Sequence, residues 1–188
     1  MLHRPQRHFT IAEYFDIEEL SPIKHEYCNG EIFAMAGASL QHNHISSNVH
    51  AHLRTALRGT GCNAFGSDLR ISTPGGLYTY PDVSVICGKV ELTADRLESA
   101  TNPVVLVEVL SDSTRDYDRG EKFTLYQAIA TLREYVLIEQ SRVLVECFRK
   151  QPDGAWVAEA YGDLDAVVKL ASVSTSIVCR DVYREVFS

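Results

Sequence analysis

The chain has 188 residues, of which 45% are hydrophobic and 23% are charged, and this composition suits one globular domain of ordinary size. The formal net charge of -7 argues against a protein that coats nucleic acid non-specifically, because contacts with phosphates require lysine and arginine. It still permits an enzyme that meets DNA through a local basic edge and bound cations. No run approaches the ~20 apolar residues of a membrane span and no secretory signal is recognisable, so we expect a cytoplasmic protein that does not enter a membrane.

No repeat, low-complexity tract or linker divides the chain, so residues 1–188 are predicted to form a single domain. The cysteines are odd in number and include no CxxC pair: Cys28, Cys62, Cys87, Cys147 and Cys179. This pattern argues against a zinc knuckle or a disulfide framework, and we expect buried free thiols instead.

The first third of the chain predicts a helix, a strand and a longer helix. Residues 9–20 begin with the spacing of a capping box and predict a short helix. The Asn29–Gly30 dipeptide is a strong turn signal, and a strand over residues 31–36 is expected to rise from it. Apolar side chains recur at helical spacing between residues 41 and 57, and this indicates an amphipathic helix.

Strands dominate the remainder of the sequence. They are predicted over residues 63–73, 77–87, 103–111, 133–139, 142–150, 156–161 and 167–172. Asp118 is expected to cap a helix after the third of these strands, and a short helix is expected to close the chain. This order predicts an α/β fold with a mixed β-sheet flanked by helices, rather than a regular doubly wound sheet.

One predicted strand carries a charge in an aliphatic run. Residues 104–110 read VVLVEVL, and the fifth of them is Glu108. An ionised carboxylate in such a run costs several kcal/mol unless another group pairs with it. Since side chains alternate along a strand, Glu108 is expected to share its face with Leu106 and Leu110.

A second acid lies in a comparable strand. Asp82 follows Pro81, which restricts where the strand can begin, and the positions after Asp82 are apolar or small. If this strand pairs with the strand of Glu108, the two carboxylates converge and repel each other unless a cation lies between them. Hard oxygen ligands favour Mg²⁺ or Mn²⁺, and a backbone carbonyl can join them.

Two further charges complete a possible hydrolytic set. Lys122 is predicted in the first turn of the helix after the Glu108 strand, where an acidic site would offset its unfavourable place on the helix dipole. Glu31, just beyond the Asn29–Gly30 turn, is a candidate third carboxylate. A metal can lower the pKa of bound water, and a lysine can orient that water or stabilise charge on a phosphate.

Each charge also has a structural interpretation. Glu108 could form a buried salt bridge with Arg115, Lys122 could be a solvated helix residue, and Glu31 could be a charge at a hairpin edge. His44 and His52 lie on one helical face, where a polar helix flank is preferred to a zinc site because no ligand set of usual spacing is complete. The GxSxG motif and a P-loop are absent from the sequence.

Three stretches together resemble the bacterial Uma-two family of restriction-endonuclease-like proteins, within the PD-(D/E)XK nuclease superfamily. They are CNGEIFAMAGASLQHNHI, YPDVSVICG and NPVVLVEVLSDSTRDYDRGEKFTLYQAIATLREYVLIEQ. The resemblance covers about residues 8–187. It implies a restriction-endonuclease-like core, an endonuclease that uses Mg²⁺ or Mn²⁺ to hydrolyse DNA, and a homodimer.

The resemblance also implies roles for individual residues. Asp82 and Glu108 match the two metal-binding acids of the superfamily, and Val109 would lend its carbonyl to the metal. Leu110 stands where the plain motif has lysine, and Lys122 supplies that lysine from the next helix.

Two more positions match the family. Glu31 matches an additional acid, implied to be catalytic and metal-binding. His42 matches a recurrent histidine to which the resemblance assigns no role.

Two functions remain open from the sequence. The first is a metal-dependent endodeoxyribonuclease, which the intact set of acids and lysine favours. The second is a catalytically silent, dimeric module that binds nucleic acid or protein on the same fold, which the acidic net charge favours. In either case an additional partner protein is possible.

Overall fold

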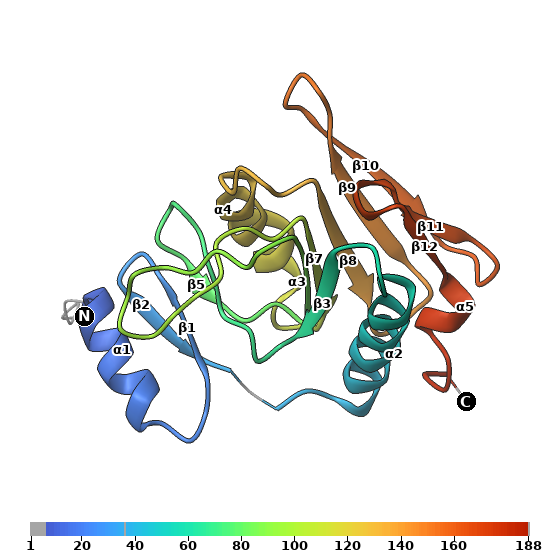
Figure 1. Cartoon of the computed structure of the whole chain (residues 1–188). Coiled ribbons are helices and arrows are strands. Elements are labelled where there is room, and N and C mark those ends of the chain that lie inside the picture. The colour runs from blue at the N-terminus through green and yellow to red at the C-terminus, as the bar shows by residue number, and fades with distance from the viewer. Residues whose placement is uncertain (1–6, 36, 188) are drawn as a thin grey trace.

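A six-stranded mixed sheet forms the centre of the protein, for which a computed structural model describes residues 7–35 and 37–187 (Figure 1). The strand order is β10-β9-β8-β7-β6-β3, and every neighbouring pair is antiparallel except β7 and β8, which are parallel. The strands are β3 (Cys62–Gly66), β6 (Val83–Cys87), β7 (Val105–Leu110), β8 (Glu134–Glu139), β9 (Val145–Lys150) and β10 (Trp156–Tyr161).

Two smaller sheets lie on either side of the centre. A four-stranded antiparallel sheet has the order β2-β1-β5-β4 and comprises β1 (His25–Cys28), β2 (Glu31–Ala34), β4 (Ile71–Ser72) and β5 (Tyr78–Thr79). A two-stranded sheet pairs β11 (Val167–Leu170) with β12 (Thr175–Val178). Figure 1 shows the N-terminal hairpin and the C-terminal strands at opposite sides of the molecule.

The helices are short apart from α2. They are α1 (Ile11–Leu20), α2 (Leu40–Ala56), α3 (Arg115–Tyr117), the π-helical turn η1 (Asp118–Lys122), α4 (Phe123–Gln127), the 3₁₀ turn η2 (Ala171–Val173) and α5 (Cys179–Val182). Within the described residues no helix is both long enough and apolar enough to cross a membrane.

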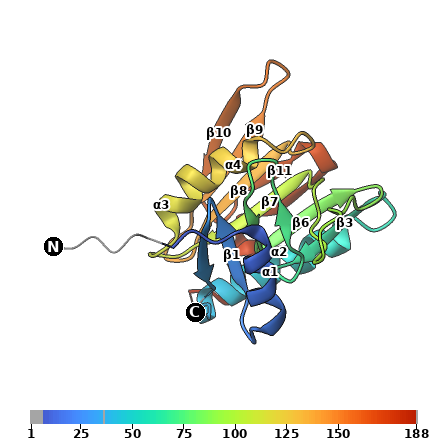
Figure 2. The same cartoon turned by 90° about the vertical axis from the view of Figure 1, so that its left-hand side faces the viewer.

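The two faces of the central sheet carry separate hydrophobic clusters. Val105, Val107 and Val109 of β7 join the cluster beneath α2, whereas Leu106 and Leu110 join the cluster beneath α4. Figure 2 shows α3 and α4 on one side of this sheet and α2 on the other. The alternation along β7 therefore directs its even-numbered side chains toward α4, and the separation of Leu106 and Leu110 from the valines agrees with the sequence prediction.

Much of the predicted element order is confirmed. The N-terminal helix has the complete capping box formed by Thr10 and Glu13, and α2 covers nearly the predicted range. Asn29 and Gly30 form the hairpin turn with positive φ angles of 50° and 90°. The predicted strand over residues 31–36 ends at Ala34, and residue 36 lies outside the described residues.

Other boundaries differ from the prediction. The expected strand over residues 77–87 divides into β5 and β6, which belong to different sheets, and the break falls at Pro81, which lacks an N–H group for a ladder. The proposed cap at Asp118 is wrong, because helical structure begins at Arg115 and Asp118 is a buried residue of η1.

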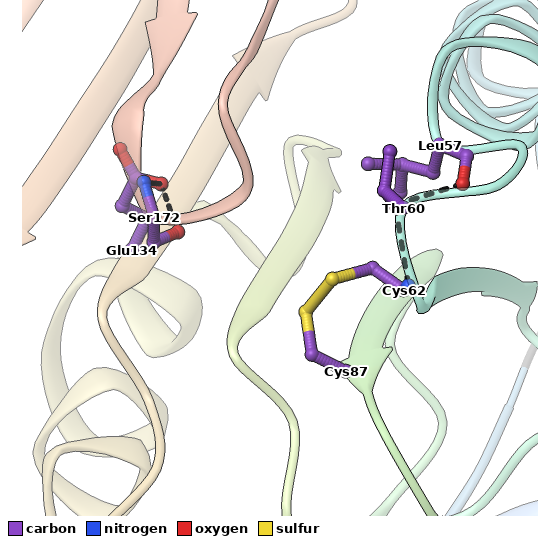
Figure 3. Close-up of a disulfide and its surroundings, with 6 residues drawn as sticks. All are labelled: Leu57, Thr60, Cys62, Cys87, Glu134 and Ser172. Atoms are coloured by element: carbon purple, nitrogen blue, oxygen red, sulfur yellow. Dashed lines mark hydrogen bonds between the residues drawn. A yellow bond between two sulfur atoms is a disulfide. The ribbon is translucent and has the colours of Figure 1, made fainter.

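The prediction of free thiols is wrong for two cysteines. Cys62 and Cys87 are opposite each other in the antiparallel pair β3–β6 and form a disulfide (Figure 3). The Thr60 hydroxyl accepts from the Cys62 N–H at 3.2 Å and donates to the Leu57 carbonyl, which ties the end of α2 to this edge. The other three cysteines are buried and free, as predicted.

Reduction of the Cys62–Cys87 disulfide is expected to lower the stability of the fold by about 3 kcal/mol, because it releases a loop of 25 residues in the unfolded chain. For a chain of this size the melting temperature should fall by roughly 6–12 °C. Thermal unfolding with and without reductant measures the effect, and a double Cys→Ser variant at the two positions serves as the control. If the double Cys→Ser variant had the melting temperature of the oxidised wild type, the disulfide would contribute nothing to the stability of the fold.

Candidate active site

The two acids singled out in the sequence meet at the pairing of β6 with β7. Val83 is opposite Val107 in this antiparallel pair, and continuing the register by one residue brings Asp82 opposite Glu108. Asp82 Oδ2 accepts a hydrogen bond from the Val109 N–H at 2.7 Å. This hydrogen bond joins the residue that precedes β6 to β7.

Lys122 lies among three carboxylates. Its Nζ atom is 2.9 Å from Glu26 Oε1, 3.0 Å from Glu108 Oε1 and 3.5 Å from Asp118 Oδ1. The side chains of Lys122, Glu108 and Asp118 are only 5–6% exposed, so these ion pairs are largely shielded from water. We call Glu26, Glu108, Asp118 and Lys122 the carboxylate–lysine cluster.

Two members of this cluster were missed at the sequence level. Glu26 lies in β1, a four-residue strand without an apolar run to mark a buried charge, and the Thr79 hydroxyl of β5 also donates to it. The spacing of Asp118 four residues before Lys122 could have indicated their contact on one helical face. The predicted acid Glu31 begins β2 opposite Cys28, whereas its hairpin neighbour Glu26 reaches Lys122.

Burial and the surrounding charges perturb the ionisation of the cluster. Burial raises the pKa of Glu108 to about 8. The charge of Lys122 lowers this pKa, and that of Asp118 raises it further. Burial likewise raises the pKa of Asp118. Burial opposes the charge on Lys122, but the carboxylates, Glu108 above all, hold the pKa of Lys122 well above its usual range. The Tyr126 hydroxyl donates to Glu108 at 2.8 Å.

His42 lies beside Asp82 rather than inside the cluster. The Nε2 atom of His42 is 3.3 Å from Asp82 Oδ2, and the two side chains are 17% and 14% exposed. Burial lowers the pKa of His42, but the Asp82 carboxylate outweighs burial, so the pKa lies above its usual value. The Nδ1 atom is buried and has no hydrogen-bond partner among the described residues.

The structural interpretation of Glu108 as the partner of Arg115 is wrong. Arg115 instead pairs with Glu139 at 2.8 Å and with Asp112 at 3.3 Å, because the start of α3 directs it toward the end of β8. In the predicted polar flank of α2, His52 Nε2 contacts the Ser176 carbonyl at 2.7 Å. Because Glu108 pairs with Lys122 and not with Arg115, Lys122 compensates the buried charge in β7.

Comparison with known proteins identifies the family. The sequence model described as "Uma2: Putative restriction endonuclease" matches residues 11–178. The chain belongs to the Uma2 family. The resemblance inferred from the sequence is thereby confirmed.

Two uncharacterized proteins are similar to most of this chain. The uncharacterized protein slr1290 of Synechocystis sp. (strain PCC 6803) is 37% identical over 97% of this chain and 96% of its own length. A second uncharacterized protein of that organism, sll1609, is 37% identical over 79% of this chain and 84% of its own.

A solved structure shares the Uma2 fold. The crystal structure of a putative nuclease belonging to DUF820 from Anabaena variabilis has a TM-score of 0.72 to this protein, with 18% identity. The match covers 89% of this chain and 93% of that one, and at this identity it shows the fold. The predicted α/β architecture, with a mixed sheet and flanking helices, is confirmed.

The donor chemistry of this Uma2 site fits a hard divalent cation. Three carboxylates of the carboxylate–lysine cluster contact a single ammonium group, and Asp82 lies near enough to Glu108 to help raise its pKa. Oxygen donors of this kind suit Mg²⁺ or Mn²⁺. Among the described residues no group of three or more His, Cys, Asp or Glu side chains is arranged to hold a metal ion, and the Lys122 ammonium group contacts the acids of the cluster.

The raised pKa of Glu108 predicts that the metal-free Uma2 protein loses stability as the pH rises. The folded pKa of about 8 exceeds the unfolded value of 4.5, so the folded state binds the proton more tightly. This contribution to stability is fully present below about pH 4.5 and is lost as the pH rises through 8.

The variant Glu108→Gln mimics the protonated side chain and should lack this contribution to the pH dependence. In the presence of chelator, the free energy of unfolding of Glu108→Gln should rise relative to that of the wild type as the pH increases from 5 to 9. Urea titrations across this range provide the measurement, with Glu159→Gln on β10 as the control. A constant difference between wild type and Glu108→Gln would contradict the assigned pKa.

Proposed function

We propose that this Uma2 protein is an endonuclease that uses Mg²⁺ or Mn²⁺ to hydrolyse phosphodiester bonds of DNA. The observation that carries the proposal is the convergence of Asp82, Glu108 and Lys122 where β6 begins beside β7. The family description adds support, since it reads "Putative restriction endonuclease". A buried acid with a strongly raised pKa beside a specific charge partner is typical of functional sites.

The proposed roles follow the chemistry of each group. Asp82 and Glu108 would hold the cation together with the Val109 carbonyl, while Glu31 remains a predicted further acid. A divalent cation, when bound, polarises a phosphoryl oxygen and lowers the pKa of water.

The fixed position of Lys122 is central to its proposed role. Glu26 and Asp118 hold its ammonium group beside Glu108. From this place Lys122 can donate a hydrogen bond to the attacking water or to charge developing on the phosphate.

A silent binding module is the second candidate function. It is favoured by the contacts of the cluster itself, because Lys122 pairs with all three of its carboxylates. On this interpretation the ammonium serves as a permanent counter-ion, and the site stabilises the fold only. Homodimer formation, a further protein partner and the cytoplasmic location remain predictions under both functions.

Incubation of the wild-type protein with supercoiled plasmid tests the proposal. We expect nicked or linear DNA in the presence of Mg²⁺ or Mn²⁺ and none in excess chelator. Parallel reactions with single-stranded DNA and with RNA establish the substrate class. If no nucleic acid is cut with either cation at millimolar concentration, the nuclease proposal fails and the silent module is preferred.

A further inference from the structure

His42 contacts an acid of the proposed site but does not belong to the carboxylate–lysine cluster. It lies in the first turn of α2, where the Ser39 hydroxyl caps the helix by accepting from the His42 N–H at 3.1 Å. Ile45 and Val49, one and two turns further on, are buried against the cluster that includes Val109. The backbone position of His42 is therefore fixed by the cap and by the core.

The contacts of Asp82 are unevenly divided between its two oxygens. The Val109 N–H donates to Oδ2 at 2.7 Å, and His42 Nε2 lies 3.3 Å from the same atom. Among the described residues both polar contacts end on Oδ2, which leaves Oδ1 without one. Two partners on a single oxygen restrict rotation of the carboxylate about its Cβ–Cγ bond.

We propose that His42 is a positioning residue, which fixes Asp82 through Oδ2 and leaves Oδ1 available to a divalent cation. This inference rests on the proposed function, because it takes Asp82 to be a metal ligand. Side chains that orient a ligand from outside typically change metal affinity by 10–100-fold when they are removed. His42 acts through Asp82 and need not touch substrate.

Substitutions of His42 by side chains of different length test this positioning role. Glutamine can place an amide N–H near the position of Nε2, whereas asparagine is too short to do so and leucine has no donor. His42→Leu and His42→Asn should therefore weaken binding of Mn²⁺ by about tenfold or more, and His42→Gln should retain roughly the affinity of the wild type. His44→Gln, a change two residues along the same helix, is the matched control and should bind as the wild type does.

Calorimetric titration with Mn²⁺ alone measures these affinities, and melting temperatures establish that each variant is folded. If His42→Leu does not fold, the comparison of His42→Asn with His42→Gln decides the matter. The inference is overturned if the variants lacking a donor bind Mn²⁺ as tightly as the wild type, or if His42→Gln binds as weakly as they do. A wild type that binds no Mn²⁺ is a different result, which overturns the proposed function and this role with it.

Discussion

Replacement of Lys122 by methionine is expected to lower the free energy of unfolding of the metal-free protein by about 3–5 kcal/mol. Lys122 is almost fully buried and is the cation shared by Glu26, Glu108 and Asp118. Its loss leaves carboxylates crowded together in a poorly hydrated site, and protonation can relieve only part of their repulsion. Urea denaturation at pH 8 in the presence of chelator measures the change.

Mn²⁺ should restore part of the stability lost in Lys122→Met, because a bound cation can replace the missing positive charge. Lys24→Met is the matched control: Lys24 pairs with Asp68, whose side chain is 99% exposed, and its loss should cost no more than about 1 kcal/mol. If Lys122→Met were as stable as the wild type without metal, the cluster would not be held together by this ammonium.

The variant Glu108→Gln is expected to cut DNA at least about a hundredfold more slowly than the wild type, a loss of about 2.7 kcal/mol in transition-state stabilisation. The amide removes the negative charge proposed to hold the cation but keeps the size of the side chain. It also keeps an oxygen that can accept from the Tyr126 hydroxyl, so the fold should persist. Initial rates of plasmid cleavage in Mn²⁺ provide the measurement.

Glu159→Gln controls for a general effect of replacing a glutamate in the same sheet. Glu159 lies on the edge strand β10 and pairs with the Arg149 side chain, away from β7 in the strand order. Its cleavage rate should match that of the wild type. Full activity in Glu108→Gln would show that a different site carries the reaction.

The position of Asp82 beside Glu108 was predicted on the condition that their two strands pair, which they do. Glu108 interrupts an apolar strand and Asp82 immediately precedes another, and pairing of the two strands brings the acids together. The lysine could also be anticipated, since it follows the strand of Glu108 by a short connection. The positions of the cores on the two faces of β7 followed from simple alternation.

The features that were missed depend on contacts between distant segments. Glu26 meets Lys122 across 96 residues, and nothing in its short strand marks it as buried. The disulfide between Cys62 and Cys87 requires the register of β3 against β6, which cysteine spacing does not reveal. Helical structure begins at Arg115, three residues before Asp118, so Asp118 is a buried helical residue instead of a cap.

The most direct test of the proposed metal site is a calorimetric titration of the wild type and of Asp82→Ala with Mn²⁺. Asp82 is accessible enough to change without emptying the buried cluster, since its side chain is 14% exposed. The wild type is predicted to bind Mn²⁺ at millimolar concentration or below, and Asp82→Ala to bind at least about tenfold more weakly, a loss of about 1.4 kcal/mol. Absence of binding by the wild type, or equal affinities in two folded proteins, would contradict the assignment of this site to a metal.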